Sequence, residues 1–412
     1  MSATLTGQVS LPGSKSESNR ALMIAAYGGF SPEVTNLSEA HDTVLLQQCL
    51  HQISSADTKA RNVIDCEDAG TVARFLLTYL ACHEGEWLLT GTPRMRQRPV
   101  GALIDALQHL GADITCQDQQ GFLPLLVKGR PIRGGEVTIN ASQSSQFVSS
   151  LLLAAPCWQQ GLRIHLEDSI SSEPYIRMTM AMMRHFGASV DQVGKTIVVQ
   201  AKPYASHPFR VSSDWSSASY WYEFAALSSS CDLLLRDLHD DTIQGDRAVS
   251  EMFVPLGVNT SFEPDGARLT KATSNSNSVV EPLSFNVSDN PDLFPTLMVT
   301  CVALNRSVVF HGIRNLVLKE SNRVDVILAE LSKLYTINYL VDDNFIIVHS
   351  SSPILINSYI NTILIQTYSD HRIAMAFAPL MTRYSGLVIE HPEVVKKSYP
   401  QYWSEIQQLK KS

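Results

Sequence analysis

The sequence predicts an α/β protein of two or three domains. Short β-rich runs alternate with amphipathic stretches of roughly 10–16 residues, a pattern typical of strands and helices that follow one another along a chain. The length of 412 residues exceeds one ordinary domain, and 44% of the residues are hydrophobic against 17% charged. No apolar run approaches the roughly 20 uncharged residues of a membrane helix. These observations favour a globular chain with a large core and no membrane partner.

Apolar periodicity predicts a dozen helices in chain order. They are expected at Ser18–Tyr27, Thr43–Ile53, Thr71–Cys82, Val100–Leu110, Ser145–Leu153, Pro174–Phe186, Ser217–Leu227, Asp246–Leu256, Asp292–Ala303, Arg323–Leu334, His371–Met381 and Pro400–Leu409. Three helices end similarly at Gly111, Gly187 and Gly257, where glycine can adopt the left-handed conformation that closes a helix. These endings indicate a repeated βαβ-type unit. The polar stretch Lys271–Ser278 is interpreted as a surface loop.

Net charge and cysteine content narrow the classes of function. The chain has 32 Lys and Arg against 40 Asp and Glu, a formal charge of −8, which is the wrong sign for binding nucleic acid or anionic lipid. An acidic ligand would therefore need a local cluster of cations. The seven cysteines lie far apart, so we expect them to be reduced and buried. Residues Met1–Leu11 do not read as a secretory signal, and we expect a cytoplasmic protein.

A small polar loop near the amino terminus has the composition of an anion site. A short strand leads into Pro12-Gly13-Ser14-Lys15-Ser16 and then into a helix that carries Arg20. Backbone N–H groups at such a helix start can approach a phosphate, and Lys15, Arg20 and the serine hydroxyls add donors. The spacing is not that of a nucleotide-hydrolysing P-loop. A serine-capped helix with two solvated cations would explain the same residues.

Arginines cluster after a second helix start. Gly70, in Asp68-Ala69-Gly70-Thr71, would permit close backbone approach of a ligand, and Arg94, Arg96 and Arg98 follow it in the sequence. Guanidinium groups bind carboxylate and phosphate with two parallel hydrogen bonds, so one or two of these arginines could hold a small acid. A solvated loop is the alternative.

Further polar residues precede helices in the middle and at the end of the chain. Ser144-Ser145-Gln146 and Ser171-Ser172-Glu173-Pro174-Tyr175 could bind phosphate or hydroxyl groups, although each is also an ordinary helix cap. The carboxy-terminal half adds charged groups at Asp289-Asn290-Pro291-Asp292, Asn315, Lys319-Glu320-Ser321-Asn322-Arg323, Asp370-His371-Arg372 and Lys396-Lys397. The cations could converge on one multiply charged substrate, while the carboxylates move protons.

His371 has two interpretations from the sequence. It could act as a base or bind a metal, but a lone histidine is more often structural, and no second histidine stands at metal-ligand spacing. The chain also lacks a nucleophile-elbow serine and a glycine-rich dinucleotide fingerprint. The residues taken by themselves predict a two-domain enzyme that acts on small anions, without a metal or a cofactor.

The motifs form one ordered set along almost the whole chain. They are Leu11-Pro12-Gly13-Ser14-Lys15, Ala69-Gly70-Thr71, Arg94-Met95, Ser144-Ser145-Gln146-Phe147, Pro174-Tyr175-Ile176, Asp214 with Ser216-Ser217-Ala218-Ser219-Tyr220, Lys319-Glu320, Asp370-His371-Arg372 and Lys397. In this order they closely resemble the 5-enolpyruvylshikimate-3-phosphate (EPSP) synthase family of enolpyruvyl transferases. The resemblance implies two similar domains, each of three βαβαββ units in an inside-out α/β barrel, with a ligand cleft between them. The implied domains are residues 1–13 plus 216–412, and residues 14–215.

The resemblance also implies an activity and its residues. Such enzymes, the targets of glyphosate, transfer the carboxyvinyl group of phosphoenolpyruvate to the 5-hydroxyl of shikimate 3-phosphate and release phosphate, in chorismate and aromatic amino acid biosynthesis. The contacts implied for shikimate 3-phosphate are Lys15, Ser16, Arg20, Ser144, Ser145, Gln146, Ser172, Tyr175, Asp292, Asn315 and Lys319. Those implied for phosphoenolpyruvate are Lys15, Gly70, Arg94, Gln146, Arg323, Arg372 and Lys397. The implied catalytic residues are Lys15, Asp292 and Glu320, and we expect no cofactor and a monomer.

Some positions depart from the family pattern. Asp68 stands where many relatives have asparagine, and Phe75 replaces a proline, which puts the affinity for phosphoenolpyruvate and glyphosate-like analogues in doubt. Glu173 stands where lysine is frequent, and Leu316-Val317-Leu318 replaces a more polar stretch. None of these changes removes a candidate catalytic residue.

Two other functions stay open. One is enolpyruvyl transfer to UDP-N-acetylglucosamine, which shares the fold and the donor but uses a cysteine-bearing loop; here Cys116 falls in an expected strand instead. The other is a non-catalytic protein of the same fold that binds small anions. Retention of Lys15, Asp292 and Glu320 argues against the second alternative.

Overall fold

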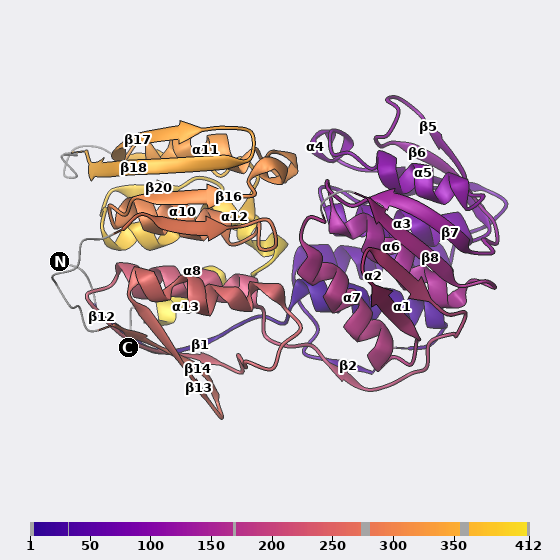
Figure 1. Cartoon of the computed structure of the whole chain (residues 1–412), viewed down its shortest axis with the longest axis horizontal. Coiled ribbons are helices and arrows are strands. Elements are labelled where there is room, and N and C mark those ends of the chain that lie inside the picture. Colours follow the sequence, from indigo (N-terminus) through magenta and orange to yellow (C-terminus); the bar gives the residue numbers. More distant parts are fainter. Residues whose placement is uncertain (1–3, 32, 168–169, 273–280, 355–361, 410–412) are drawn as a thin grey trace. The chain divides into compact units, whose positions relative to one another are not determined.

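The computed structural model describes residues 4–31, 33–167, 170–272, 281–354 and 362–409 (Figure 1). From residue 273 onward, the expected loop Lys271–Ser278 lies outside this part of the chain. The chain divides into two compact units: Met1–Gly13 with Ser212–Ser412, called here the split unit, and Ser14–Val211, called the continuous unit. Among the described residues, no helix is both long enough and apolar enough to cross a membrane.

The continuous unit contains two four-stranded sheets of the same topology. One has the spatial order β3 (Arg61–Asp65), β4 (Gly85–Thr90), β6 (Leu125–Gly129) and β5 (Asp113–Cys116), and the other has the order β7 (Gly135–Asn140), β8 (Leu162–Glu167), β10 (Thr196–Val199) and β9 (Val190–Val193). In both, the first pair is parallel and the other two pairs are antiparallel. A short parallel pair joins β2 (Val34–Thr35) to β11 (Phe209–Arg210).

The split unit repeats this arrangement. Its two four-stranded sheets have the orders β1 (Thr4–Ser10), β12 (Ser230–Arg236), β14 (Gly266–Lys271), β13 (Val258–Glu263), and β15 (Leu283–Asn286), β16 (Val308–His311), β18 (Phe345–Pro353), β17 (Tyr335–Val341). Again the first pair of each is parallel and the rest are antiparallel. A parallel pair joins β19 (Ile363–Ile365) to β20 (Leu387–Ile389).

Helices connect the strands in both units. In the continuous unit they are α1 (Lys15–Gly28), α2 (His41–Ser54), α3 (Gly70–Cys82), α4 (Pro93–Arg96), α5 (Gly101–His109), α6 (Ser145–Ala154) and α7 (Glu173–His185). In the split unit they are α8 (Trp215–Leu227), α9 (Val249–Met252), α10 (Phe294–Ala303), α11 (Arg323–Leu331), α12 (His371–Phe377) and α13 (Tyr402–Leu409). Short 3₁₀ turns η1 (Ala155–Cys157), η2 (Gly245–Ala248), η3 (Val254–Leu256), η4 (Arg314–Leu318), η5 (Ala378–Thr382) and η6 (Pro392–Lys397) complete the set.

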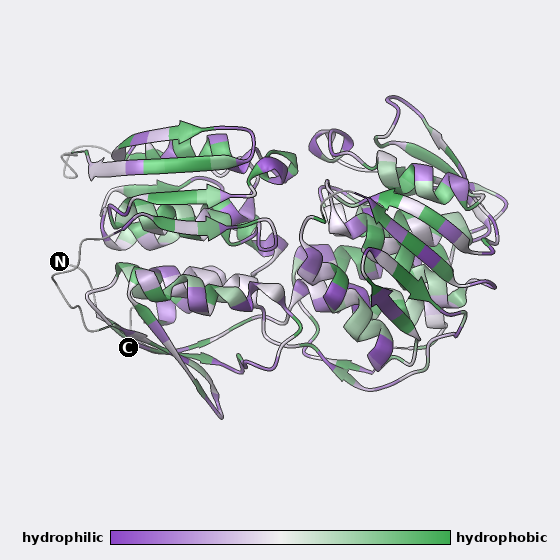
Figure 2. Cartoon of the chain, viewed as in Figure 1, coloured by the Kyte–Doolittle hydropathy of each residue, from purple (hydrophilic) through white to green (hydrophobic). Residues whose placement is uncertain are grey.

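Each unit has a core of three inner helices. In the continuous unit α1, α3 and α6 contact one another, and in the split unit α8, α10 and α12 do so. Every residue of α10 and α12 is buried, so these helices have no solvent-facing stripe and their sequences are apolar almost throughout. Figure 2 shows the hydrophobic first half of β18, which packs against α10. The polar exceptions in α12 are His371 and Arg372, which form its first turn.

The predicted helices agree with the observed ones to within a few residues, with one exception. The expected helix Asp246–Leu256 is broken into η2, α9 and η3, because Pro255 has no backbone N–H and restricts the residue before it. The three expected helix-closing glycines do have left-handed backbones, with φ of 96° at Gly111 and 86° at both Gly187 and Gly257.

The structure changes two expectations from the sequence, one about the repeated unit and one about the burial of the cysteines. Two units of each half are complete βαβαββ units, while the third contributes a two-stranded sheet. All seven cysteines are free thiols, but the expectation that all are buried was wrong: Cys157 is exposed, and Cys82 and Cys116 are half-buried.

Candidate active site

Polar side chains of the continuous unit gather at the first turns of its inner helices. Ser14 caps α1, and Ser144 caps α6 by accepting a hydrogen bond of 3.2 Å from the backbone N–H of Gln146. The side-chain amide of Gln146 in turn donates to the Thr71 hydroxyl of α3 at 3.0 Å. Within the described residues, no side chain caps α3. Because helix first turns carry free N–H groups and partial positive charge, this gathering favours an anion.

Lys15 is the first residue of α1, and its ammonium is held by a carboxylate from the next helix. The Nζ atom lies 2.8 Å from Oδ2 of Asp42 in α2, whose side chain is only 3% exposed. The ion pair fixes a lysine that would otherwise be mobile. Asp42 was not recognised in the sequence, because a carboxylate near a helix start resembles an ordinary favourable charge.

Arg20 is buried on the second turn of α1. Its guanidinium donates to the Thr179 hydroxyl at 2.7 Å, to the Ser16 carbonyl at 2.9 Å, and to Ser149 and the Tyr175 carbonyl. The rings of Phe75 and Tyr175 lie 5.6 and 5.9 Å from it, within cation–π range. Burial lowers the pKa of Arg20 to about 10, so it stays charged at neutral pH. The unusual Phe75 thus packs against a predicted ligand contact.

Two further arginines surround Gly70 at the start of α3. A Cβ atom on Gly70 would lie 2.6 Å from Nη1 of Arg98 and 2.7 Å from Nη1 of Arg74, so no larger residue fits without displacing them. Both arginines are buried, whereas Arg94 is half-buried at the start of α4. Of the three clustered arginines, the structure therefore brings Arg98 to Gly70. Spacing alone could not distinguish between them.

Two more of the predicted serines of this unit lie at helix starts. Ser145 is buried in the first turn of α6. Ser172 precedes α7, has a left-handed backbone with φ of 56°, and is 7% exposed. Glu173, which departs from the family pattern, is the first residue of α7 and lies 3.7 Å from Arg177.

The split unit has a different kind of cluster, centred on Arg323. This guanidinium, in the first turn of α11, pairs at 2.9 Å with each of three carboxylates, those of Asp292, Glu320 and Asp370. Although burial by itself would lower the pKa of Arg323, the three carboxylates raise it above its ordinary value. The cluster combines the predicted catalytic carboxylates with a predicted anion-binding cation.

Asp292 is held by a second arginine as well. Nη2 of Arg372, in the first turn of α12, donates to Oδ2 of Asp292 at 2.6 Å, while Nη1 donates to the Tyr220 hydroxyl of α8 at 3.2 Å. Burial opposes ionisation of Asp292, but Arg372, Lys319 and Arg323 together hold its pKa well below the usual range. Asp292 is therefore ionised in this state.

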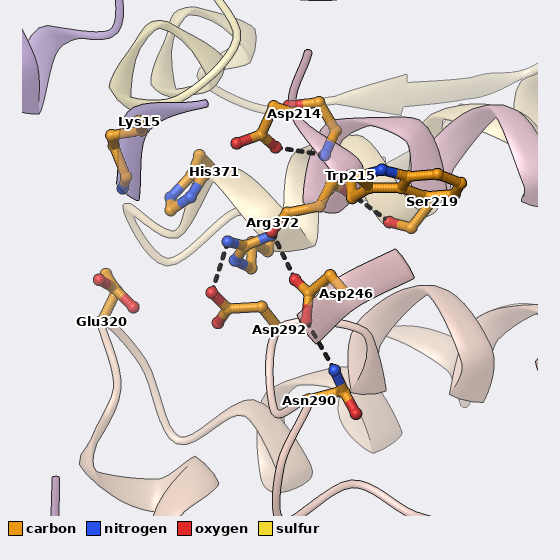
Figure 3. Close-up of polar contacts among 12 residues, drawn as sticks. Lys15, Asp214, Trp215, Ser219, Asp246, Asn290, Asp292, Glu320, His371 and Arg372 are labelled. Carbon is orange, nitrogen blue, oxygen red and sulfur yellow. Dashed lines mark hydrogen bonds and ion pairs between the residues drawn. The ribbon is translucent and has the colours of Figure 1, made fainter. Parts of the chain in front are cut away.

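A buried carboxyl that sequence inspection missed lies next to Asp292 (Figure 3). Asp246 accepts hydrogen bonds from the Ser216 hydroxyl at 2.5 Å and from the Asn290 side-chain amide at 3.1 Å. Burial, followed by the charge of Asp292, raises the pKa of Asp246 to about 6. It was the first residue of the expected helix Asp246–Leu256, where an acidic residue is ordinary, so neither motif nor spacing identified it.

The remaining predicted residues of the split unit lie on or next to its 3₁₀ turns and at the start of α12. Asn315 is in η4, Lys319 follows it, and Lys397 ends η6 in a buried position. His371 is 1% exposed, and its Nδ1 atom lies 3.7 Å from Oδ1 of Asp370. Over the described parts of the chain, no group of three His, Cys, Asp or Glu side chains is arranged to hold a metal ion.

Comparison with solved structures shows that other proteins share this fold. An EPSP synthase from Acinetobacter baumannii superposes with a TM-score of 0.73 at 22% sequence identity, covering 98% of this chain and 96% of that one. The enolpyruvyl transferase NikO from Streptomyces tendae gives a TM-score of 0.67 at 15% identity, covering 98% and 95%. At these identities the likeness establishes the fold alone.

Sequence comparison resolves the family. The model of the EPSP synthase (3-phosphoshikimate 1-carboxyvinyltransferase) family matches residues 1–406. A 3-phosphoshikimate 1-carboxyvinyltransferase from Bacteroides fragilis is 40% identical, covering 97% of this chain and 94% of the relative, and one from Syntrophobacter fumaroxidans is 34% identical, covering 98% and 97%. The chain belongs to the EPSP synthase family, as its motifs predicted.

Proposed function

We propose that this protein transfers the enolpyruvyl group of phosphoenolpyruvate to the 5-hydroxyl of shikimate 3-phosphate and releases phosphate. The observation that carries the proposal is the match of the family over residues 1–406, with the candidate acid–base residues retained. The cluster of Asp292, Glu320, Arg323 and Arg372 supports it, because the reaction needs carboxylates beside cations. The division into two units supports the two-domain organisation expected from the sequence.

The reaction needs both an acid and a base. The methylene carbon of phosphoenolpyruvate gains a proton, which makes the neighbouring enol carbon electrophilic. The 5-hydroxyl loses its proton as its oxygen attacks that carbon, giving a tetrahedral intermediate. Loss of phosphate, together with a proton from the new methyl group, then forms the enol ether. We assign the hydroxyl proton to Asp292, and delivery and removal of the methyl proton to Glu320 and Lys15.

The ion pairs of the split unit suggest how Asp292 becomes a base. Without substrate, Arg323 and Arg372 donate to it at 2.9 and 2.6 Å and hold its pKa low. The carboxylate and phosphate of phosphoenolpyruvate would compete for these two guanidinium groups. Each donor transferred to the substrate raises the proton affinity of Asp292. Binding of one substrate would thus prepare the base for the other.

The continuous unit is proposed to contribute mainly anion binding. Lys15, Arg20, Ser144 and Gln146 supply charge and donors for shikimate 3-phosphate, following the family pattern. Arg98 is added to the proposed phosphoenolpyruvate contacts alongside Gly70 and Arg94, since it lies against the backbone of Gly70. Binding through such preorganised donors costs little reorganisation when charge develops.

A phosphate-release assay tests the proposal. The purified protein should release phosphate when shikimate 3-phosphate and phosphoenolpyruvate are both present, and not when either is omitted. Mass spectrometry of the product should show the carboxyvinyl adduct. Activity with UDP-N-acetylglucosamine in place of shikimate 3-phosphate would select the related transferase instead. Binding of both small anions without turnover would indicate a non-catalytic protein.

A further inference from the structure

A strained turn immediately precedes Asp370, His371 and Arg372 in the split unit. Tyr368 and Ser369 both have left-handed backbones, with φ of 51° and 56°. The turn is closed by a hydrogen bond of 2.8 Å from the Asp370 backbone N–H to the Thr367 carbonyl. Two consecutive non-glycine residues in this conformation are unfavourable, and they persist only where surrounding contacts impose them. Some other part of the unit must therefore hold the turn.

Helix α11 supplies those contacts from both of its ends. At its start, Nε of Arg323 donates to Oδ2 of Asp370 at 2.9 Å. Near its end, Glu330 accepts from the Tyr368 hydroxyl at 2.8 Å and from the Gln366 backbone N–H at 3.0 Å. Arg323 and Glu330 are seven residues apart, about two helical turns, so they lie on the same face of α11.

Glu330 is suited to a fixed support. It is 1% exposed although it carries a carboxylate, and Lys333 pairs with it at 2.6 Å. A buried carboxylate with three donors is held in one position, whereas the Tyr368 side chain is 41% exposed. The hydroxyl of Tyr368 thus ties an exposed side chain of the strained turn to a fixed point in the core.

The turn determines where the Arg372 side chain begins. Asp370 caps α12 by accepting from the Arg372 backbone N–H at 3.0 Å, and Arg372 reaches Asp292 from there. A change in the turn would therefore shift the helix start and the guanidinium together.

We propose that Glu330 and Tyr368 are positioning residues, which act through the strained turn to place Arg372 for phosphoenolpyruvate. The proposal rests on the proposed function for its kinetic readout. It extends the candidate site to a pair of residues remote from the reacting atoms. Neither residue is expected to touch a substrate.

Tyr368→Phe removes the hydroxyl alone and is the primary test. We expect the KM for phosphoenolpyruvate to rise roughly tenfold, equivalent to about 1.4 kcal/mol, while the KM for shikimate 3-phosphate changes less than about twofold. Tyr339→Phe is the matched control, since Tyr339 is a 44% exposed tyrosine on β17 of the same unit. It should leave both constants unchanged. An unchanged KM for phosphoenolpyruvate in Tyr368→Phe, or an equal rise for both substrates, would overturn the proposal.

A rescue experiment separates positioning from general destabilisation. Glycine adopts left-handed backbones without strain, so Ser369→Gly should reduce the dependence of the turn on its support. The double variant Tyr368→Phe with Ser369→Gly should return the KM for phosphoenolpyruvate to within about threefold of the wild type. A double variant as impaired as Tyr368→Phe would contradict the role of strain.

Hydrogen exchange provides a readout that does not depend on turnover. In Tyr368→Phe the backbone amides of Asp370 and Arg372 should exchange roughly tenfold faster than in the wild type, and Tyr339→Phe should not change them. Absent turnover in the wild type would count against the proposed function. Unchanged exchange in Tyr368→Phe would refute the support of the turn, whatever the activity.

Discussion

Each unit buries an arginine within the first two turns of a helix, Arg20 in α1 and Arg323 in α11, but the two units balance the charge differently. In the split unit Arg323 is surrounded by three carboxylates. In the continuous unit the hydrogen-bond acceptors of Arg20 are two hydroxyls and two backbone carbonyls, all neutral. Arg372 and Lys319 also act on Asp292, so three cations face three carboxylates in the first arrangement, whereas the direct hydrogen-bond acceptors of Arg20 carry no charge.

This difference separates two chemical tasks. Burial lowers the pKa of Arg20 to about 10 although Tyr175 and Glu17 oppose the shift, while the carboxylates around Arg323 raise the pKa of that arginine. A retained charge favours binding of an anion such as a phosphate. A cluster of acids and cations can instead exchange partners and move protons. We therefore expect substitution of Arg20 to affect binding first, and substitution of the carboxylates around Arg323 to affect turnover.

The largest expected effect is on turnover in the split unit. Asp292→Asn or Glu320→Gln should lower kcat by about 10²–10⁴-fold with modest changes in KM, because each removes a group assigned to proton transfer. Initial rates of phosphate release measure this. Asp232→Asn, at an exposed ion pair with Arg268 in the same unit, is the control and should keep wild-type rates. Near-normal turnover in both test variants would remove the distinction between the units.

The second effect contrasts the two buried arginines directly. Arg323→Ala leaves the fully buried carboxylate of Asp370 without its main cation, so it should destabilise the fold by about 3–5 kcal/mol. Arg20→Ala removes a charge whose hydrogen-bond acceptors are all neutral, so the loss should be smaller, about 1–3 kcal/mol. Chemical denaturation measures both.

For the binding of shikimate 3-phosphate, the order of the two arginine variants should be the reverse of their order in stability. Arg20→Ala should raise the KM for shikimate 3-phosphate roughly 10–100-fold, a larger effect than any change it makes in kcat. The comparison fails if Arg20→Ala costs more stability than Arg323→Ala and leaves the KM for shikimate 3-phosphate unchanged.

The third effect concerns pH and Asp246. Burial is the main cause and the negative charge of Asp292 the second; together they raise the pKa of Asp246 from an ordinary value of 3.8 to about 6. The folded state therefore binds more protons than the unfolded chain between about pH 4 and pH 6. Stability falls as pH rises through that window, and the penalty remains above it. Asp246→Asn should remove a penalty on the order of 3 kcal/mol at pH 8, with no gain below pH 4.

The amide of an asparagine at position 246 could still accept one hydrogen bond and donate to the Ser216 hydroxyl, which can accept as well as donate. Thermal unfolding of wild type and variant at pH 4 and pH 8 makes the comparison. A variant less stable than the wild type at pH 8 would show that the hydrogen bonds of the ionised carboxylate outweigh its burial.

The sequence predicted local structure better than contacts across the fold. Helices with a full apolar face were found because periodicity reports burial directly, and glycines such as Gly187 identified helix ends by their backbone freedom. The prediction of one helix over residues 246–256 was wrong, because the apolar spacing there resembles that of a helix although Pro255 interrupts the segment.

The sequence motifs predicted which segments form the candidate site, but not which side chains contact one another. The sequence identified three clustered arginines after Gly70, but the structure was needed to show that Arg98 lies against that glycine. The hydrogen bond between Arg372 and Tyr220 joins residues 152 positions apart, and the one from Arg20 to Thr179 joins residues 159 positions apart. Such contacts depend on how inner helices pack, which no local pattern encodes.

The smallest effect tests whether the continuous unit is tuned by charge alone. Asp68 is half-buried two residues before Gly70. Asp68→Asn removes one negative charge near the proposed phosphoenolpyruvate contacts, so the KM for phosphoenolpyruvate should fall about two- to threefold with kcat unchanged. Because salt screens a partly exposed charge, the difference should shrink when ionic strength rises from about 0.01 M to 0.15 M. Glu67→Gln, an exposed neighbour of the same charge, serves as control and should change KM less. A KM that rises instead would mean that Asp68 acts by ordering the arginines around Gly70. Its positioning of these cations would then outweigh its repulsion of the anionic substrate.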